Sequence, residues 1–284
     1  MKKGKRRDLT PLRGTPPWEW TEEDGERILE TLRDRSADPS DRLLAARLAG
    51  ESPVIHDELA DTLLAIAGRK GEDEAVRKAA VCSLGPALEL ADLMEGGGGE
   101  DDLISPAMFQ KVQKTLRRLY FDAAVPPSVR RKILESSSRA PREWHENAIR
   151  AAVKSGDIHW ERTAVFSMRF VKGFDREILG ALDSGDLLVR YHAVRAAGNW
   201  GLEDAWTRIS AFAEGKGTDR EIRLAAIDAI TGIRPVESAE ILRRLARFGD
   251  EDVAEAALEA LAVAEGRDDG DVFDENGEED DPFL

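Results

Sequence analysis

The side chains best suited to chemistry in this sequence are four histidines and one cysteine. They are His56, His145, His159, His192 and Cys82. None of them has the spacing of a zinc-binding cluster, and Cys82 has no histidine close to it in the sequence. Only His145 is followed directly by a glutamate, Glu146. We therefore predict no metal site, no cofactor and no catalytic residue.

Sequence motifs of common catalytic folds are also missing. The sequence has no Gly-x-Ser-x-Gly, no phosphate-binding P-loop and no dinucleotide-binding fingerprint. Its one glycine run, Gly96 to Gly99, has no strand before it, and Glu100, Asp101 and Asp102 follow it and would repel phosphate. The sequence thus predicts a protein that is not an enzyme.

A second group of side chains is suited to binding. Its members are cationic or aromatic and are predicted to share one helix face: Lys78, Arg131, Arg162, Arg169, Tyr191 and Arg195. We call this set the second-helix patch. Such a surface would attract an acidic segment of another protein, although a solvated helix face without a partner has the same composition. Toward the C-terminus the face turns acidic, with Asp228, Glu255 and Glu259.

An internal repeat of about 30 residues positions these side chains. Its anchor positions are 41, 76, 129, 160, 189, 222 and 253, with spacings of 35, 53, 31, 29, 33 and 31 residues. The one long spacing contains the glycine run. The rest is rich in Ala, Leu, Arg and Glu, with amphipathic stretches ahead of the anchors, as at Ile178 to Leu182. This pattern predicts stacked pairs of helices with the anchors on the second helix of each pair.

Two columns of charged residues accompany the anchors. An aspartate stands three residues before six of the seven, at Asp38, Asp73, Asp157, Asp186, Asp219 and Asp250, and Pro126 takes that place in the third copy. An arginine follows five anchors, at Arg42, Arg77, Arg130, Arg190 and Arg223. The aspartates are predicted to cap the second helices. The arginines are predicted to bond the aspartates of neighbouring repeats in a ladder.

The Asp…Val-Arg…Ala signature with its period near 31 residues resembles HEAT or HEAT-like repeats over residues 21–265. The resemblance implies an all-α, right-handed α-solenoid of about seven stacked helical hairpins. It also implies a protein–protein scaffold that binds its partner on the concave face, which the second helices line. Some HEAT-like proteins instead attach bilins, act on DNA, or hydroxylate proteins with iron held by repeated His-Glu dyads. Only His145-Glu146 matches such a dyad here, so the scaffold is our expectation and an enzyme is the alternative.

Net charge narrows the choice of partner. The chain has 284 residues and a formal charge of −15. Residues 1–14 carry +5 and residues 266–284 carry −8, and both ends are predicted to be disordered arms. The negative balance opposes binding to nucleic acid or to an anionic membrane. A single cysteine and the lack of a long apolar run favour the cytoplasm. We also expect a monomer, with another protein as its partner.

Two segments outside the repeats have alternative interpretations. The acidic tail, residues 266–284, is interpreted as a solubilising segment or as one that folds back onto the second-helix patch. The basic and then Pro/Trp-rich arm, residues 1–20, contains Trp18 and Trp20. We expect these tryptophans to cover the exposed end of the solenoid, with docking to a partner as the alternative. A Gly-rich acidic insertion is predicted at 95–104.

Overall fold

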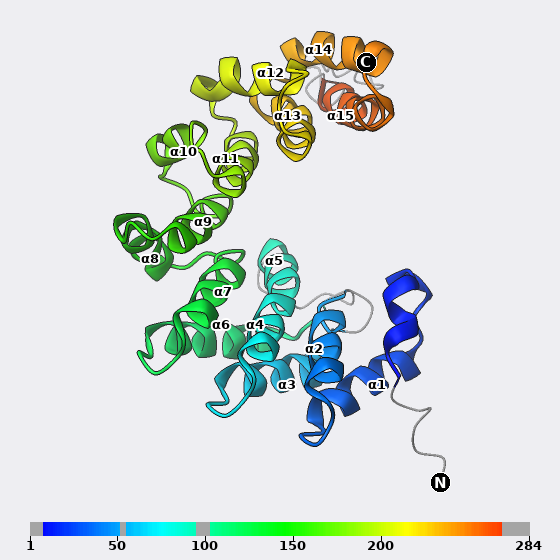
Figure 1. The fold of residues 1–284 in the computed structure, drawn as a ribbon, viewed down its shortest axis with the longest axis vertical. Helices are drawn as coiled ribbons and strands as arrows, with labels where there is room; N and C mark the ends of the chain where they lie inside the picture. The colour runs from blue at the N-terminus through cyan, green and yellow to red at the C-terminus, as the bar shows by residue number, and fades with distance from the viewer. Residues whose placement is uncertain (1–7, 52–54, 95–102, 269–284) are drawn as a thin grey trace, which may run out of the picture. The chain divides into compact units, whose positions relative to one another are not determined.

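A computed structural model describes residues 8–51, 55–94 and 103–268 of the chain (Figure 1). These residues form helices and turns only, and they divide into two compact units, Met1–Val171 and Lys172–Leu284. The predicted all-α fold is confirmed: each unit is a stack of helical hairpins, as in an α-solenoid. No described helix is long and apolar enough to cross a membrane.

The first unit stacks four hairpins. Their first helices are α1 (Glu22–Arg33), α3 (Asp57–Gly68), α6 (Pro106–Phe121) and α8 (Glu143–Lys154). Their second helices are α2 (Pro39–Leu48), α4 (Glu74–Ser83), α7 (Pro127–Ser137) and α9 (Ile158–Ser167). Each second helix packs against the next one along the chain (Figure 1). An extra helix, α5 (Gly85–Leu93), lies between the second and third hairpins in sequence and packs on α7.

The second unit stacks three hairpins. Their first helices are α10 (Asp175–Ala181), α12 (Trp206–Glu214) and α14 (Pro235–Phe248), and their second helices are α11 (Leu187–Asn199), α13 (Arg220–Ile233) and α15 (Glu251–Asp268). Glycines allow the closest approach here. A Cβ atom on Gly232 of α13 would lie 2.4 Å from the carbonyl oxygen of Gly198 on α11. Small residues thus bring these second helices into backbone contact.

All seven anchor positions lie on second helices, as the period predicts. Val76, Val129, Val189, Ile222 and Val253 are at most 2% exposed. The two anchors outside this group are Asp41, which is exposed, and Trp160, which is half-buried. The repeat frame read from the sequence therefore describes the hairpins of both units.

The six predicted aspartate caps are confirmed. Each carboxylate accepts a hydrogen bond from one or two backbone N–H groups in the first turn of its second helix. Asp157, for example, accepts from His159 N at 2.7 Å and Trp160 N at 3.3 Å. Pro126, which replaces aspartate in the third copy, occupies the same N-cap position without a side-chain bond.

The predicted Asp–Arg ladder is wrong for Arg42 and Arg77. Arg42 binds Glu72 of the next hairpin at 2.8 Å, and Arg77 donates to the Ala67 carbonyl at 2.9 Å. Arg223 donates to the Ala213 carbonyl at 3.0 Å and also lies 3.5 Å from Asp250, a contact of the expected kind. Arg190 donates to the Ser184 carbonyl. Arg130 is half-buried, and its Nε is without a hydrogen bond.

The arginine column therefore serves a different purpose from the one predicted. Arg42, Arg77 and Arg223 each donate to a carbonyl ten residues earlier in the chain. These carbonyls belong to Leu32, Ala67 and Ala213, at the C-terminal ends of first helices. The last carbonyls of a helix lack backbone donors and carry partial negative charge. The guanidinium groups of Arg42, Arg77 and Arg223 donate to these carbonyls within their own hairpins.

The arms differ partly from expectation. Disorder is wrong for residues 8–14, where Thr10–Gly14 forms a 3-10 turn and Leu9 and Leu12 are buried. Trp18 is 80% exposed and so does not cover the end of the stack, whereas Trp20 is half-buried and donates to the Thr15 carbonyl at 2.9 Å. Helix α15 continues to Asp268, three residues into the predicted tail. The rest of the tail and most of the Gly-rich insertion lie outside the described residues.

Candidate binding site

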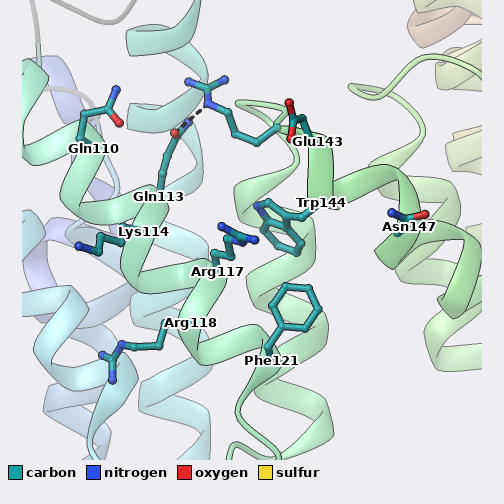
Figure 2. Close-up of a pocket in the computed structure, with 10 residues that line it drawn as sticks. Gln110, Gln113, Lys114, Arg117, Arg118, Phe121, Glu143, Trp144 and Asn147 are labelled. Carbon is teal, nitrogen blue, oxygen red and sulfur yellow. Dashed lines mark hydrogen bonds between the residues drawn. The ribbon is translucent and has the colours of Figure 1, made fainter.

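The strongest candidate site is a groove between the first helices of two successive hairpins in the first unit, α6 and α8 (Figure 2). Its volume is about 870 Å³. We call it the α6–α8 groove. The lining residues are Gln110, Gln113, Lys114, Arg117, Arg118 and Phe121 from α6, and Arg142, Glu143, Trp144 and Asn147 from the start of α8. The cationic side chains in this set indicate that the groove could bind an anion.

The cations on the α6 side of the groove are exposed. Helix α6 contains four basic residues and no acidic ones, at positions 111, 114, 117 and 118. Lys111 is paired with Asp61 at 2.6 Å. Within the described part of the chain, Lys114, Arg117 and Arg118 have no ion pair. Three positive charges are therefore available to a ligand.

Aromatic rings form the wall beside these cations. The Trp144 ring lies 5.6 Å from the Phe121 ring and 5.1 Å from the Tyr120 ring, centroid to centroid. Phe121 is 61% exposed. Figure 2 shows Arg117 directed toward Trp144, with Phe121 beside both. A large apolar side chain exposed next to a guanidinium is a common feature of binding surfaces.

A hydrogen-bond network fixes the start of α8 at the groove. The Arg142 guanidinium donates to Gln113 Oε1 at 2.9 Å and to Asp92 at 3.0 Å. The Arg142 backbone N–H donates to His145 Nδ1 at 2.9 Å. His145 Nε2 lies 3.0 Å from the Ser137 hydroxyl, and the His145 ring stacks on Trp144 at 3.8 Å. The Trp144 wall is thus held in place from two sides.

His145 has a structural environment. Its side chain is 1% exposed, and both ring nitrogens have hydrogen-bond partners. Burial lowers the pKa of His145 to about 4, so the imidazole is neutral at pH 7. Glu146 points elsewhere and pairs with Arg150 at 2.9 Å. The only His-Glu dyad in the sequence is therefore engaged in packing and surface pairing.

The remaining candidates for chemistry are separate from one another. His56 and His159 are exposed at the starts of α3 and α9, and His192 is half-buried on α11. Cys82 lines a hollow of about 460 Å³ on the second-helix side of the first unit, with Lys78 and Lys132. Across the described residues, no three His, Cys, Asp or Glu side chains are grouped so that they could hold a metal ion.

The second-helix patch is divided between the two units, and each of its members is half-buried. Lys78, Arg131, Arg162 and Arg169 belong to the first unit, and Tyr191 and Arg195 to the second.

Several residues of the second-helix patch have partners within the fold. Arg195 pairs with Asp228 at 2.9 Å, Arg131 lies 5.8 Å from the Trp160 ring, and Arg169 lies 5.3 Å from the Phe170 ring. Lys78 is 4.0 Å from Glu74, and the Tyr191 ring is 5.3 Å from the His192 ring. Partner binding by this patch stays a prediction.

The sequence prediction missed the α6–α8 groove because it followed the second helices. A signal was present, since Lys114, Arg117, Arg118 and Phe121 have the i, i+3, i+4, i+7 spacing of one helix face. The other wall could not be predicted, because Trp144 comes from the next hairpin.

Comparison with known proteins supports the fold. Residues 176–262 match the family model of HEAT repeats. Human deoxyhypusine hydroxylase in complex with glycerol is similar at 15% identity and a TM-score of 0.41, covering 88% of this chain and 87% of that one. An engineered protein is similar at 16% identity and a TM-score of 0.36, covering 84% and 78%. Both TM-scores are below 0.5, so neither likeness carries an argument about fold or function. A search of curated proteins finds no match. The resemblance to HEAT repeats is confirmed over residues 176–262.

Proposed function

We propose that this protein is a non-enzymatic scaffold that binds an acidic partner protein through its first unit. The observation that carries the proposal is the separation of charge. Residues 103–171, which form α6 to α9, contain 13 basic and 6 acidic residues, a net charge of +7 in a chain of −15. We call these two hairpins the basic hairpins. A concentrated positive region on an acidic protein favours an acidic partner surface.

The same observation disfavours nucleic acid as the partner. The rest of the chain carries −22, and a long phosphate backbone that extends beyond the basic hairpins would meet that charge. A short acidic protein surface needs to contact only the cationic region. Long-range attraction then speeds the encounter, and local contacts decide affinity.

Affinity capture from the native source, with quantitative mass spectrometry, tests this proposal. The full chain is compared with a variant carrying Arg117→Glu and Arg118→Glu and with a control carrying Arg35→Glu and Lys70→Glu, two positions outside the basic hairpins. All four side chains are exposed, and both variants change the charge by the same amount. We expect acidic proteins to be retained by the full chain and the control and lost from the first variant. Equal retention by all three would contradict the proposal.

The rival interpretation, a HEAT-like enzyme, has its own test. Metal analysis and an absorbance scan of the purified protein would reveal iron or a pigment. We expect neither, and iron at about one or two equivalents per chain would overturn the non-enzymatic part of the proposal.

A further inference from the structure

We propose that the α6–α8 groove is a docking site for a short, extended, acidic segment of a separate protein, with an aromatic residue just after its acidic residues. This inference rests on the proposed function and assigns it a site and a ligand chemistry. It places the contact on the first-helix face, away from the second-helix patch that the sequence suggested.

The unpaired cations define where the acidic residues of the ligand lie. Lys114, Arg117 and Arg118 are exposed along one stretch of α6, and among the described residues they have no acidic partners. Elsewhere on the same helix, Lys111 is already paired with Asp61. An acidic ligand therefore gains three cationic contacts here without breaking an existing ion pair. Arginine also offers two donors to one carboxylate, which favours clustered acidic residues.

The aromatic wall defines the second part of the ligand. Trp144 and Phe121 stand at the end of the cationic stretch, and Phe121 leaves 61% of its surface in water. An aromatic ring from the ligand could pack against them edge to face. Because Arg117 is directed toward Trp144 (Figure 2), its guanidinium would contact both the ring and the neighbouring carboxylate of the ligand.

One acidic residue of the groove sets the direction of the ligand. Glu143 is exposed on the α8 side, beside Trp144. It would repel a carboxylate placed against α8, so the acidic residues of the ligand are confined to α6 and its aromatic residue to the Trp144 side. Two groove residues, Gln110 and Asn147, are exposed and carry side-chain amides that can bond the ligand backbone.

The dimensions fit a short peptide. From Gln110 to Phe121 the helix rises roughly 17 Å, which is the length of about five residues of extended chain. The volume of about 870 Å³ is within the range of ordinary ligand pockets. A folded acidic domain would contact only the rim, whereas an extended segment can lie along the groove.

Fluorescence polarisation with the full chain and a labelled peptide EDEDGFG tests the proposal. Two matched peptides replace its phenylalanine by alanine or its acidic residues by their amides. We expect the parent peptide to bind, each change in the peptide to weaken binding at least fivefold, and Trp144→Ala to weaken it about as much. Arg117→Glu with Arg118→Glu should weaken binding more than tenfold, and the control Arg35→Glu with Lys70→Glu should stay within twofold.

The measurement separates the alternatives. Equal losses in the control and in the Arg117/Arg118 variant would show diffuse charge attraction and overturn the site, as would equal binding of the peptide that lacks the aromatic residue. Tighter binding of a single-stranded oligonucleotide of equal charge would reassign the groove to nucleic acid. Binding that appears only after residues 269–284 are removed would make the chain's own acidic segment the occupant, which also overturns the proposal.

The two proposals can fail separately. Trp144→Ala could disturb packing, so thermal unfolding followed by circular dichroism accompanies each variant, and the exposed Arg117 and Arg118 changes carry the conclusion. If acidic partners are captured by the full chain but no peptide binds, the scaffold proposal stands and the groove assignment falls. If no partner is captured and the peptide still binds, the groove assignment stands and the scaffold proposal falls.

Discussion

The basic hairpins and the second unit contain the same number of cations but differ in how many of them have acidic partners. Residues 103–171 and residues 172–268 each contain 13 basic residues, but the first segment has 6 acidic residues and the second has 19. In the second unit most arginines bridge neighbouring hairpins: Arg195–Asp228, Arg208–Asp183, Arg220–Asp252, Arg223–Asp250, Arg234–Glu203 and Arg244–Glu214. In the basic hairpins three cations of α6 have no such partner among the described residues.

This difference follows from how closely each region keeps the repeat pattern. The second unit keeps the capping aspartates and small residues at contacts such as Gly198 with Gly232, and it is the region that matches HEAT repeats. The third and fourth hairpins depart from the pattern at Pro126 and at Glu161, which replaces arginine. Aromatic packing among Tyr120, Trp144 and Trp160 takes over there. Most arginines of the regular unit thus join neighbouring hairpins, whereas Lys114, Arg117 and Arg118 of the irregular hairpins have no ion pair among the described residues.

The largest expected effect concerns His145, which packs under the groove of the basic hairpins. Its pKa of about 4 lies below the usual 6.5 because the ring is buried. The unfolded chain therefore binds more protons than the folded one between these values, and stability falls as the pH falls from about 6.5 to 4. The loss amounts to about 3 kcal/mol.

Chemical denaturation followed by Trp fluorescence at several pH values measures this. His145→Gln should flatten the pH dependence of unfolding of the first unit relative to the parent protein. An imidazole of His145 that titrates near pH 6.5 by NMR would contradict the buried, neutral state.

The next largest expected change in stability comes from the close packing of helices in the second unit. Gly232→Ala would place a methyl group 2.4 Å from the Gly198 carbonyl oxygen, and overpacking of this kind costs about 1–3 kcal/mol. The control is Gly180→Ala on α10, where a Cβ atom meets nothing within 4 Å. There we expect a gain of up to about 1 kcal/mol. Thermal unfolding measures both, and equal shifts would show that the helices are not in backbone contact.

Loss of a capping aspartate should have a smaller effect. Asp186 accepts hydrogen bonds from Leu188 N and Val189 N, both at 3.1 Å. Asp186→Ala should destabilise the second unit by about 1 kcal/mol. Asp186→Asn keeps an acceptor and should cost less. If the alanine variant unfolds at the temperature of the parent protein, the cap adds nothing.

The smallest effect compares a paired arginine with an unpaired one. Arg208→Gln removes a 2.9 Å ion pair with Asp183 on the exposed surface and should cost about 0.5 kcal/mol. Arg117→Gln should leave stability unchanged. A larger loss from Arg117→Gln would show that this residue stabilises the fold and is not free for a ligand.

The hairpins and their caps could be predicted from the sequence because they depend on local spacing. An aspartate such as Asp73, three residues before a buried valine, bonds atoms only a few residues away. The partners of the arginine column could not be predicted. Arg77 lies near both a carbonyl and an acid, and only the three-dimensional path of the preceding loop decides between them.

The groove was beyond sequence reasoning for a similar reason. Its two walls, around Arg117 and Trp144, are about 25 residues apart on helices that the repeat pattern treats as supports. The burial of Leu9 and Leu12 was also missed, because two apolar residues are too few to show periodicity. Both features depend on contacts between hairpins or with the chain end, which no local pattern encodes.

Arginine-specific modification of the full chain, followed by mass spectrometry, tests the contrast between the two regions most directly. We expect Arg117 and Arg118 to react several times faster than Arg208 and Arg220, whose guanidinium groups are held by Asp183 and Asp252. We also expect the peptide EDEDGFG to protect only the first pair. Equal rates for all four arginines, or protection of all four, would contradict the proposal that Arg117 and Arg118 are available to a partner.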